Sequence, residues 1–274
     1  MRFAKAYVEI SNICNLSCSF CPGTTRNKRM MNAEEFTNIL EKLSGYVEYL
    51  YFHLLGEPLM HPQLESFLNS AQSRGYKVTV TTNGALIDAK KDILLKASPY
   101  KIVFSLHSFE ANSITKPLEK YLENCFSFAK SIEGKSIIVF RLWNNGGEDK
   151  LNREIEDKLK QYFTDWKTTR NGIGIGNRIF LQYGDKFDWP DNDLKDEVSE
   201  VFCYGLRDQI GILADGTVVP CCLDNNGTIA LGNIFSQTLD EILSSPRAVA
   251  LYDGFSNRCP TEQLCRKCTY ARRF

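Results

Sequence analysis

The sequence predicts an α/β protein with a parallel sheet, followed by a small cysteine-rich C-terminal region. Strand-like apolar runs alternate with amphipathic helical stripes nearly six times between residues 4 and 182, a pattern that requires right-handed crossovers. After residue 184 the composition changes to an aspartate-rich stretch that contains Pro190, which is typical of a connector. All ten cysteines except Cys125 lie before residue 22 or after residue 202. The chain is therefore organised around two cysteine-bearing regions.

Each strand and helix has a local signal. Asn32, with Glu35 three residues later, is typical of a helix start. Gly172, Gly174 and Gly176 precede the last strand rather than follow one, so we expect a flexible loop there and no nucleotide-binding turn. Hydrophobic periodicity predicts strands at 4–10, 47–55, 77–82, 101–106, 136–142 and, more weakly, 179–182, and helices at 32–43, 64–71, 88–97, 117–132 and 151–163.

The C-terminal region has a different pattern. Residues 185–196 are expected to connect it to the preceding sheet. Alternating apolar residues at 209–219, interrupted by Asp215-Gly216, predict a β-hairpin. A short helix is expected at 239–243, with an interruption at Pro246 and a resumption through Tyr252.

Composition limits the functional classes. The 274 residues contain 33 basic and 33 acidic side chains, so no net charge favours nucleic acid or an acidic membrane surface as a partner. We find neither a basic-then-apolar leader nor an apolar run of the ~20 residues that a membrane helix needs. We therefore expect a cytoplasmic protein. In that compartment thiols stay reduced, so ten cysteines indicate metal or redox chemistry.

The cysteines near the N-terminus carry the strongest signal. Cys14, Cys18 and Cys21 follow the first predicted strand with a CxxxCxxC spacing, and Phe20 precedes the last of them. Iron–sulfur cubanes normally have four cysteine ligands, so a local trio indicates an open iron site. The pattern resembles the signature of radical S-adenosylmethionine (SAM) enzymes. A zinc site, whose usual CxxC pairs do not match this spacing, and inert buried thiols are the alternatives.

The resemblance implies a fold, cofactors and contacts for residues 1–184. It implies a partial (β/α)6 TIM-type barrel in which Cys14, Cys18 and Cys21 hold a 4Fe-4S cluster. In the family, the free iron chelates S-adenosylmethionine, whose reductive cleavage yields a 5′-deoxyadenosyl radical. Reduction calls for an electron donor such as flavodoxin or ferredoxin.

Several residues resemble the family's cofactor contacts. Gly56-Glu57-Pro58 is similar to the GGEP segment that binds the amino group of S-adenosylmethionine, although Leu55 replaces the first glycine. Ser105 matches a position that often contacts the ribose, and Phe20 belongs to the cysteine motif. Arg141 is suited to a carboxylate of the cofactor or the substrate, or it extends from a strand end towards solvent. These residues are the expected cofactor-binding set.

Two histidines fall near strand ends at the expected active face. His53 and His107 could serve as acids or bases because histidine titrates near neutrality. We expect each instead to be a structural histidine whose hydrogen bonds are satisfied. Cys125, on the apolar stripe of a predicted helix, is expected to be a core thiol.

The C-terminal cysteines resemble a second iron–sulfur module. Cys203 and Cys221 flank the predicted hairpin, and Cys265 and Cys268 form a late CxxC. This layout is similar to the twitch domain, the shortened form of the SPASM extension, in which four cysteines hold an auxiliary 4Fe-4S cluster. The resemblance implies such a domain at 203–274, joined by a connector at 185–202. A zinc knuckle could use the same pairs, and Cys259 could replace one of the terminal pair.

Two clusters suggest a reaction. Removal of a hydrogen atom from an alcohol carbon leaves a radical that becomes a carbonyl after losing a proton and an electron, and a second cluster can accept that electron. The cysteine layout most resembles twitch dehydrogenases of aminocyclitol alcohols. The leading hypothesis is therefore a radical SAM oxidoreductase acting on a small polar substrate such as an aminocyclitol or sugar. A cavity rich in acidic groups would favour a cationic aminosugar, and a long groove would favour a peptide.

Other functions stay open. Related enzymes modify or epimerise ribosomally made peptides or sugars, and epimerisation needs a hydrogen-atom donor, for which Cys222 or Cys259 is available. A more remote alternative is a non-catalytic iron–sulfur or zinc protein. The substrate is thus expected to be a small molecule or a peptide.

Overall fold

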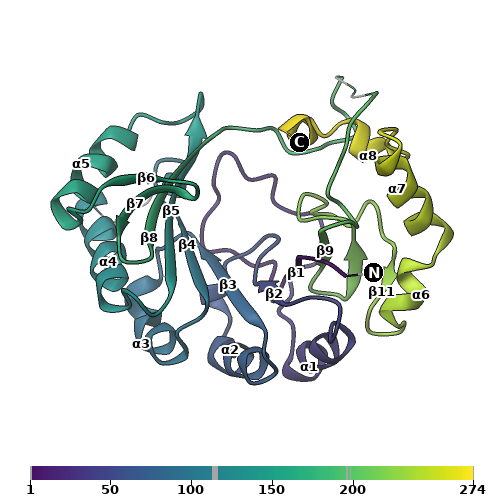
Figure 1. The fold of residues 1–274 in the computed structure, drawn as a ribbon, viewed down its shortest axis with the longest axis horizontal. Helices are drawn as coiled ribbons and strands as arrows, with labels where there is room; N and C mark the ends of the chain where they lie inside the picture. Colours follow the sequence, from purple (N-terminus) through teal and green to yellow (C-terminus); the bar gives the residue numbers. More distant parts are fainter. Residues whose placement is uncertain (1, 113–116, 196, 198, 274) are drawn as a thin grey trace.

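The strands that the structure describes form one curved sheet. The computed structural model describes residues 2–112, 117–195, 197 and 199–273. Eleven strands are hydrogen-bonded in the order β11-β10-β9-β1-β2-β3-β4-β5-β8-β7-β6. Figure 1 shows the sheet bending into an arc with α1–α5 on its outer side. This mixed α/β fold, with its parallel central strands, confirms the predicted fold class.

The central strands and helices follow the predicted alternation. Six neighbouring strands in the order β1-β2-β3-β4-β5-β8 pair in parallel. The parallel strands are β1 (Lys5–Val8), β2 (Tyr49–Tyr51), β3 (Lys77–Thr82), β4 (Lys101–Ser105), β5 (Ile137–Asn145) and β8 (Ile179–Asp185). The helices between them are α1 (Ala33–Lys42), α2 (Leu64–Ser73), α3 (Ile87–Ala97), α4 (Leu118–Ser131) and α5 (Asn152–Tyr162), and short 3-10 turns occur at η1 (Pro58–Met60) and η2 (Leu106–Ser108).

Local signals explain where these elements lie. Asn32 caps α1 through the backbone N–H of Glu35, whose carboxylate accepts from the Asn32 N–H in return. Phe36 on the buried face of α1 stacks on Phe67 of α2 with ring centroids 4.2 Å apart. Cys125 in α4 is fully buried, as expected for a core thiol.

The expectation of a flexible glycine loop before the sixth strand is wrong. Residues Gly172–Gly176 form β7, which pairs antiparallel with β6 (Lys167–Thr169) on one side and with β8 on the other. Ile173 pairs with Leu181, and Ile175 is fully buried. The two isoleucines give the segment a strand-like alternation, while the small glycines let neighbouring side chains approach its backbone closely.

The C-terminal region extends the same sheet. β9 (Gln209–Ile212) pairs in parallel with β1, and β10 (Thr217–Val219) and β11 (Gly232–Asn233) follow antiparallel. The predicted hairpin forms, and Gly216 takes φ +83° in its turn. Strands from both sides of the expected domain boundary at residue 203 therefore belong to one continuous sheet. The helical elements of this region are α6 (Leu239–Leu243), α7 (Pro246–Ser256), α8 (Gln263–Arg266) and η3 (Thr269–Arg273).

The connector after β8 crosses from one side of the arc to the other, where the C-terminal helices lie (Figure 1). Its Phe187 packs edge-on against Tyr270, with ring centroids 5.0 Å apart. Arg273 donates to the backbone oxygen of Asp185 at 3.1 Å. The connector and η3 thus hold each other at the open side of the sheet. None of the helices in the described ranges has the length and apolarity to cross a bilayer.

Candidate functional site

The first cysteine loop follows β1 directly. Cys14 and Cys21 are exposed, and Cys18 is partly buried. The Cys21 backbone N–H donates to the Cys18 oxygen at 3.0 Å, which curls the loop around the thiols. Burial raises the pKa of Cys18 to about 11, with smaller increases from the nearby Cys21 and Cys14. The three predicted thiols therefore lie within electrostatic range of one another on a solvent-accessible loop.

Amide side chains from two other loops hold this cysteine loop. Asn83, directly after β3, donates from Nδ2 to Asn15 Oδ1 at 2.9 Å and to Cys14 Sγ at 3.8 Å. Asn112 donates to Cys18 Sγ at 3.0 Å and accepts from the Ser17 N–H at 2.8 Å. Asn112 was not identified from the sequence, because it lies in an irregular segment more than ninety residues from its partners.

The Gly56-Glu57-Pro58 segment also touches the cysteine loop. Gly56 has φ +74°, and a Cβ there would meet the Ser11 backbone oxygen at 2.2 Å, so only glycine fits. The Glu57 N–H donates to the Ile13 oxygen at 2.9 Å. Pro58 begins η1.

The Glu57 carboxylate serves to position loops. It is 1% exposed and accepts from the Asn83 N–H at 2.8 Å and the Leu59 N–H at 3.0 Å. Burial raises the pKa of Glu57 to about 7, although these backbone donors act in the opposite direction. Glu57 therefore ties the turn after β2 to the turn after β3.

A cavity of about 460 Å³ opens at the carboxyl side of the parallel strands, within the size range of small-molecule sites. Three of the predicted cofactor-binding residues, Phe20, Ser105 and Arg141, line it. The charged side chains in its described lining are Lys5, Arg141, Lys186 and Asp208. The acidic cavity that would favour a cationic aminosugar is therefore not what the described lining forms.

The two histidines at this cavity differ. His107 is satisfied, as expected: its Nδ1 lies 3.1 Å from the Arg141 backbone oxygen and 3.4 Å from the Trp143 nitrogen. The expectation for His53 is wrong, because its buried Nδ1 has no hydrogen-bond partner among the described residues. Burial, followed by the charges of Arg141 and Lys5, lowers the pKa of His53 to about 3. His53 is thus a neutral imidazole with a free nitrogen at the cavity wall.

The structure brings the second cysteine set together. Cys203, Cys221, Cys265 and Cys268 line one small cavity whose other walls are mainly apolar. Burial raises the pKa of Cys203 to about 11, with further increases from Cys268 and Cys222. Cys259 is exposed and does not line this cavity.

Cys222, adjacent to that set, faces the larger cavity. Tyr7, Cys203, Cys221 and Cys268 also line this larger cavity. The structure therefore places three thiols of the second set and Phe20 of the first cysteine loop around one shared space. As the side chains stand, no three His, Cys, Asp or Glu residues in the described ranges are arranged for a single metal ion.

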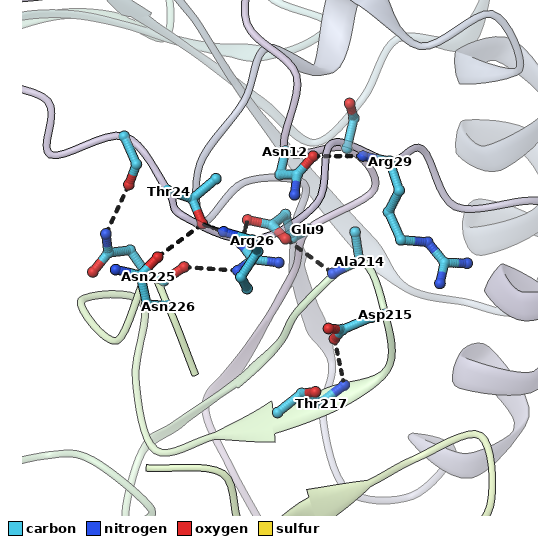
Figure 2. A network of polar contacts seen from close by, with 12 residues as sticks. Glu9, Asn12, Thr24, Arg26, Arg29, Ala214, Asp215, Thr217, Asn225 and Asn226 are labelled. Carbon is cyan, nitrogen blue, oxygen red and sulfur yellow. Dashed lines mark hydrogen bonds and ion pairs between the residues drawn. The ribbon is translucent and has the colours of Figure 1, made fainter. Parts of the chain in front are cut away.

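A polar network joins the first cysteine loop to the C-terminal region (Figure 2). Glu9 is fully buried, and its carboxylate accepts from Arg26 Nη2 at 2.7 Å and from the Ala214 N–H at 2.9 Å. Arg26 Nε donates to the Asn225 oxygen at 2.9 Å. Asn226 Oδ1 accepts from the Thr25 N–H at 3.0 Å. This network was not identified from the sequence, since its contacts with Ala214, Asn225 and Asn226 span about two hundred residues.

Comparisons with known proteins agree with this geometry. The sequence pattern of the radical SAM superfamily matches residues 8–141, and that of SPASM, an iron–sulfur cluster-binding domain, matches residues 203–269. The chain thus contains a radical SAM domain followed by a SPASM domain. The radical SAM domain implies a 4Fe-4S cluster and S-adenosylmethionine, and the SPASM domain implies auxiliary iron–sulfur binding.

Curated relatives cover only part of the chain. A tungsten-containing aldehyde ferredoxin oxidoreductase cofactor-modifying protein of Pyrococcus furiosus is 31% identical over 30% of this chain and 24% of its own length. The S-adenosyl-L-methionine-dependent 2-deoxy-scyllo-inosamine dehydrogenase of Niallia circulans is 23% identical over 39% of this chain and 46% of its own. The alignments with the first curated relatives thus span about a quarter to a third of those proteins.

Solved structures share the fold over nearly the whole chain. BtrN in complex with AdoMet and 2-DOIA superposes with a TM-score of 0.60 at 18% identity, covering 98% of this chain and 94% of BtrN. Native anSMEcpe with bound AdoMet gives 0.65 at 14% identity, covering 98% and 87%. The fold shared with these two structures therefore extends through the C-terminal region.

Proposed function

We propose that this protein is a radical SAM oxidoreductase that removes a hydrogen atom from an alcohol carbon of a small polar substrate and oxidises it by two electrons. One observation carries the proposal. The cavity at the carboxyl side of the sheet is lined by Phe20 of the first cysteine loop and by Cys203, Cys221 and Cys268 of the second set. A substrate there would lie between the site of hydrogen removal and an electron acceptor.

The chain supplies ligands and contacts for both cofactors. Cys14, Cys18 and Cys21 would hold the first cluster, and their exposed loop suits an open coordination position. When bound, the reduced cluster and S-adenosylmethionine supply the radical that takes the hydrogen atom. Phe20 and Ser105 would border S-adenosylmethionine on the cavity side, together with the backbone at Gly56, and Arg141 would face a carboxylate of the cofactor or an oxyanion of the substrate.

His53 lies where it could relay the hydroxyl proton. Conversion of the alcohol to a carbonyl releases one hydrogen atom from carbon, one proton from oxygen and one electron. The unpartnered Nδ1 of His53 lies at the cavity wall and is neutral, but its pKa of about 3 makes it a weak base, so it would pass the proton on rather than hold it. The electron would pass to a cluster held by Cys203, Cys221, Cys265 and Cys268. A flavodoxin- or ferredoxin-type partner would reduce the first cluster.

A second candidate is epimerisation of a sugar or peptide residue. It is favoured by Cys222, whose side chain lines the cavity, whereas Cys259 is exposed away from it. In that reaction Cys222 would return a hydrogen atom to the substrate radical. The Cys222→Ala variant should then keep SAM cleavage and lose inverted product, and persistent inversion would eliminate this role.

Anaerobic reconstitution tests the proposed function. The reconstituted protein should bind about eight irons per chain and, with dithionite, form 5′-deoxyadenosine from S-adenosylmethionine, measured by mass spectrometry. Failure to form it with a fully reduced cluster would overturn the enzymatic role and favour a binding protein. Zinc in place of iron would exclude the radical chemistry.

A further inference from the structure

Several cations of the barrel interior lack acidic partners. Lys5 and Arg141 line the large cavity, and Lys101 lies near them, since the charges of Arg141 and Lys5 both lower its pKa after the effect of burial. Lys5, Lys101 and Arg141 form no ion pair with the acidic residues that the structure describes. Lys5 and Arg141 therefore share one partly enclosed space, and Lys101 lies within electrostatic range of both.

Lys77, at the same level of the sheet as Lys5, differs from Lys5 in having an acidic partner. In the sheet register Lys5 pairs with Tyr49, and Tyr49 pairs with Lys77. Lys77 forms an ion pair with Glu48 and approaches the Tyr49 hydroxyl at 3.4 Å. The charge of Lys77 is thus compensated within the protein, whereas that of Lys5 is not.

Lys5 has only weak alternative contacts. Its Nζ lies 5.4 Å and 5.5 Å from the ring centroids of Tyr7 and Tyr51. Burial lowers the pKa of Lys5, Arg141 lowers it further, and Cys222 and Asp208 act in the opposite direction. Asp208 lines the same cavity but is not within ion-pair distance of Lys5. An aromatic ring stabilises a nearby cation less than a carboxylate would stabilise that cation.

Three unpartnered polar atoms belong to residues that line the same cavity as Lys5. Arg141 Nε, His53 Nδ1 and Thr81 Oγ1 are buried and have no hydrogen-bond partner among the described residues, and all three residues line the cavity. Buried polar groups are normally paired, so a group of unsatisfied ones indicates a missing partner. A guanidinium, an ammonium and a hydroxyl together can donate to several oxygens of one oxyanion.

We propose that Lys5, Arg141 and Thr81, with Lys101 nearby, bind an oxyanion of the substrate, a phosphate or carboxylate. The proposal rests on the proposed function and restricts its substrate to an acid or phosphate ester, in place of a cationic aminocyclitol. An oxyanion there would neutralise the clustered cations and receive hydrogen bonds from the unpartnered donors. S-adenosylmethionine also carries a carboxylate, so the test must separate that source from the substrate.

The test measures inorganic phosphate binding to the reconstituted holoprotein by calorimetry, with saturating S-adenosylmethionine and without it. We expect binding under both conditions and at least about tenfold weaker binding in Lys5→Gln. The matched control Lys77→Gln should bind within about twofold of wild type. Lys101→Gln, at the edge of the cluster, provides a second variant if Lys5→Gln folds poorly by iron content and circular dichroism.

Each other result overturns the proposal. Phosphate binding that S-adenosylmethionine abolishes would assign the cations to the cofactor carboxylate. An equal loss of phosphate affinity in Lys5→Gln and Lys77→Gln would indicate a general charge effect. Absence of phosphate binding both with and without S-adenosylmethionine would show that the site does not exist. Because calorimetry needs no turnover, 5′-deoxyadenosine formation by the same preparation separates failure of this site from failure of the proposed function.

Discussion

The two cysteine sets occupy opposite environments. Cys14 and Cys21 lie exposed on a loop that polar side chains hold in place, among them Asn83 and Asn112. The second set surrounds a small cavity whose walls include Leu223, Ile229, Phe255 and Leu264. An open, polar setting leaves room for an exchangeable ligand, whereas an apolar enclosure suits a cluster with complete protein coordination. The contrast suggests that one set binds a reactant and the other exchanges only electrons.

Loss of a ligand from the exposed loop should have the largest effect on chemistry. In Cys18→Ala we expect iron to fall by about four per chain and 5′-deoxyadenosine formation to fall to background. The free energy of unfolding should change by less than about 1 kcal/mol, because the loop contributes little to the core. Cys259→Ser is the matched control, since its exposed thiol should leave iron content and SAM cleavage unchanged.

The enclosed set should respond in the opposite way. Cys221→Ala should also lose about four irons, yet retain SAM cleavage and lose oxidised product. Its free energy of unfolding should fall by an amount on the order of 3 kcal/mol, since metal binding in an enclosed site is coupled to folding. Equal effects of Cys18→Ala and Cys221→Ala on stability, measured by urea unfolding under anaerobic conditions, would contradict the contrast.

The network of Figure 2 should link the two regions energetically. The Arg26 and Glu9 side chains are 12% and 0% exposed, and Arg26→Met leaves the Glu9 carboxylate buried without its cation. We expect a loss of about 3 kcal/mol of stability, measured by urea unfolding of the holoprotein. Arg29→Met, which removes a more exposed pair with Glu35 in the same segment, should cost less than about 1 kcal/mol. Similar losses in both variants would show that the network does not couple the regions.

The sequence was sufficient for the parts of the fold with local signals. Alternating apolar periodicity identified the six parallel strands, and cysteine spacing identified both thiol groups that the structure brings together. The strand Gly172–Gly176 was not predicted, because three of its five residues are glycine and only two isoleucines show the alternating apolar pattern. The pairing of β9 with β1 and the contacts of Arg26 with Asn225 and of Glu9 with Ala214 join distant segments. Such contacts depend on how the chain closes in space, and no local pattern encodes them.

The smallest expected effect concerns the cavity wall between the two sets. The pKa of His53 is about 3 in the folded protein because of burial and nearby cations, and about 6.5 when unfolded. Between these values the unfolded chain binds more protons, so this histidine lowers stability as pH falls below 6.5. At pH 5.5 its cost is about 1.4 kcal/mol.

His53→Gln should therefore reduce the loss of stability between pH 7.5 and 5.5 by about 1.4 kcal/mol, measured by urea unfolding of the holoprotein at both values. If His53→Gln lost as much stability between pH 7.5 and 5.5 as the wild type, His53 would have to become protonated in the folded protein over this range. That would require a nearby anion to offset the charges of Lys5 and Arg141. The same variant should keep 5′-deoxyadenosine formation while slowing carbonyl formation, because it removes the proposed proton relay at the cavity wall without touching either cysteine set.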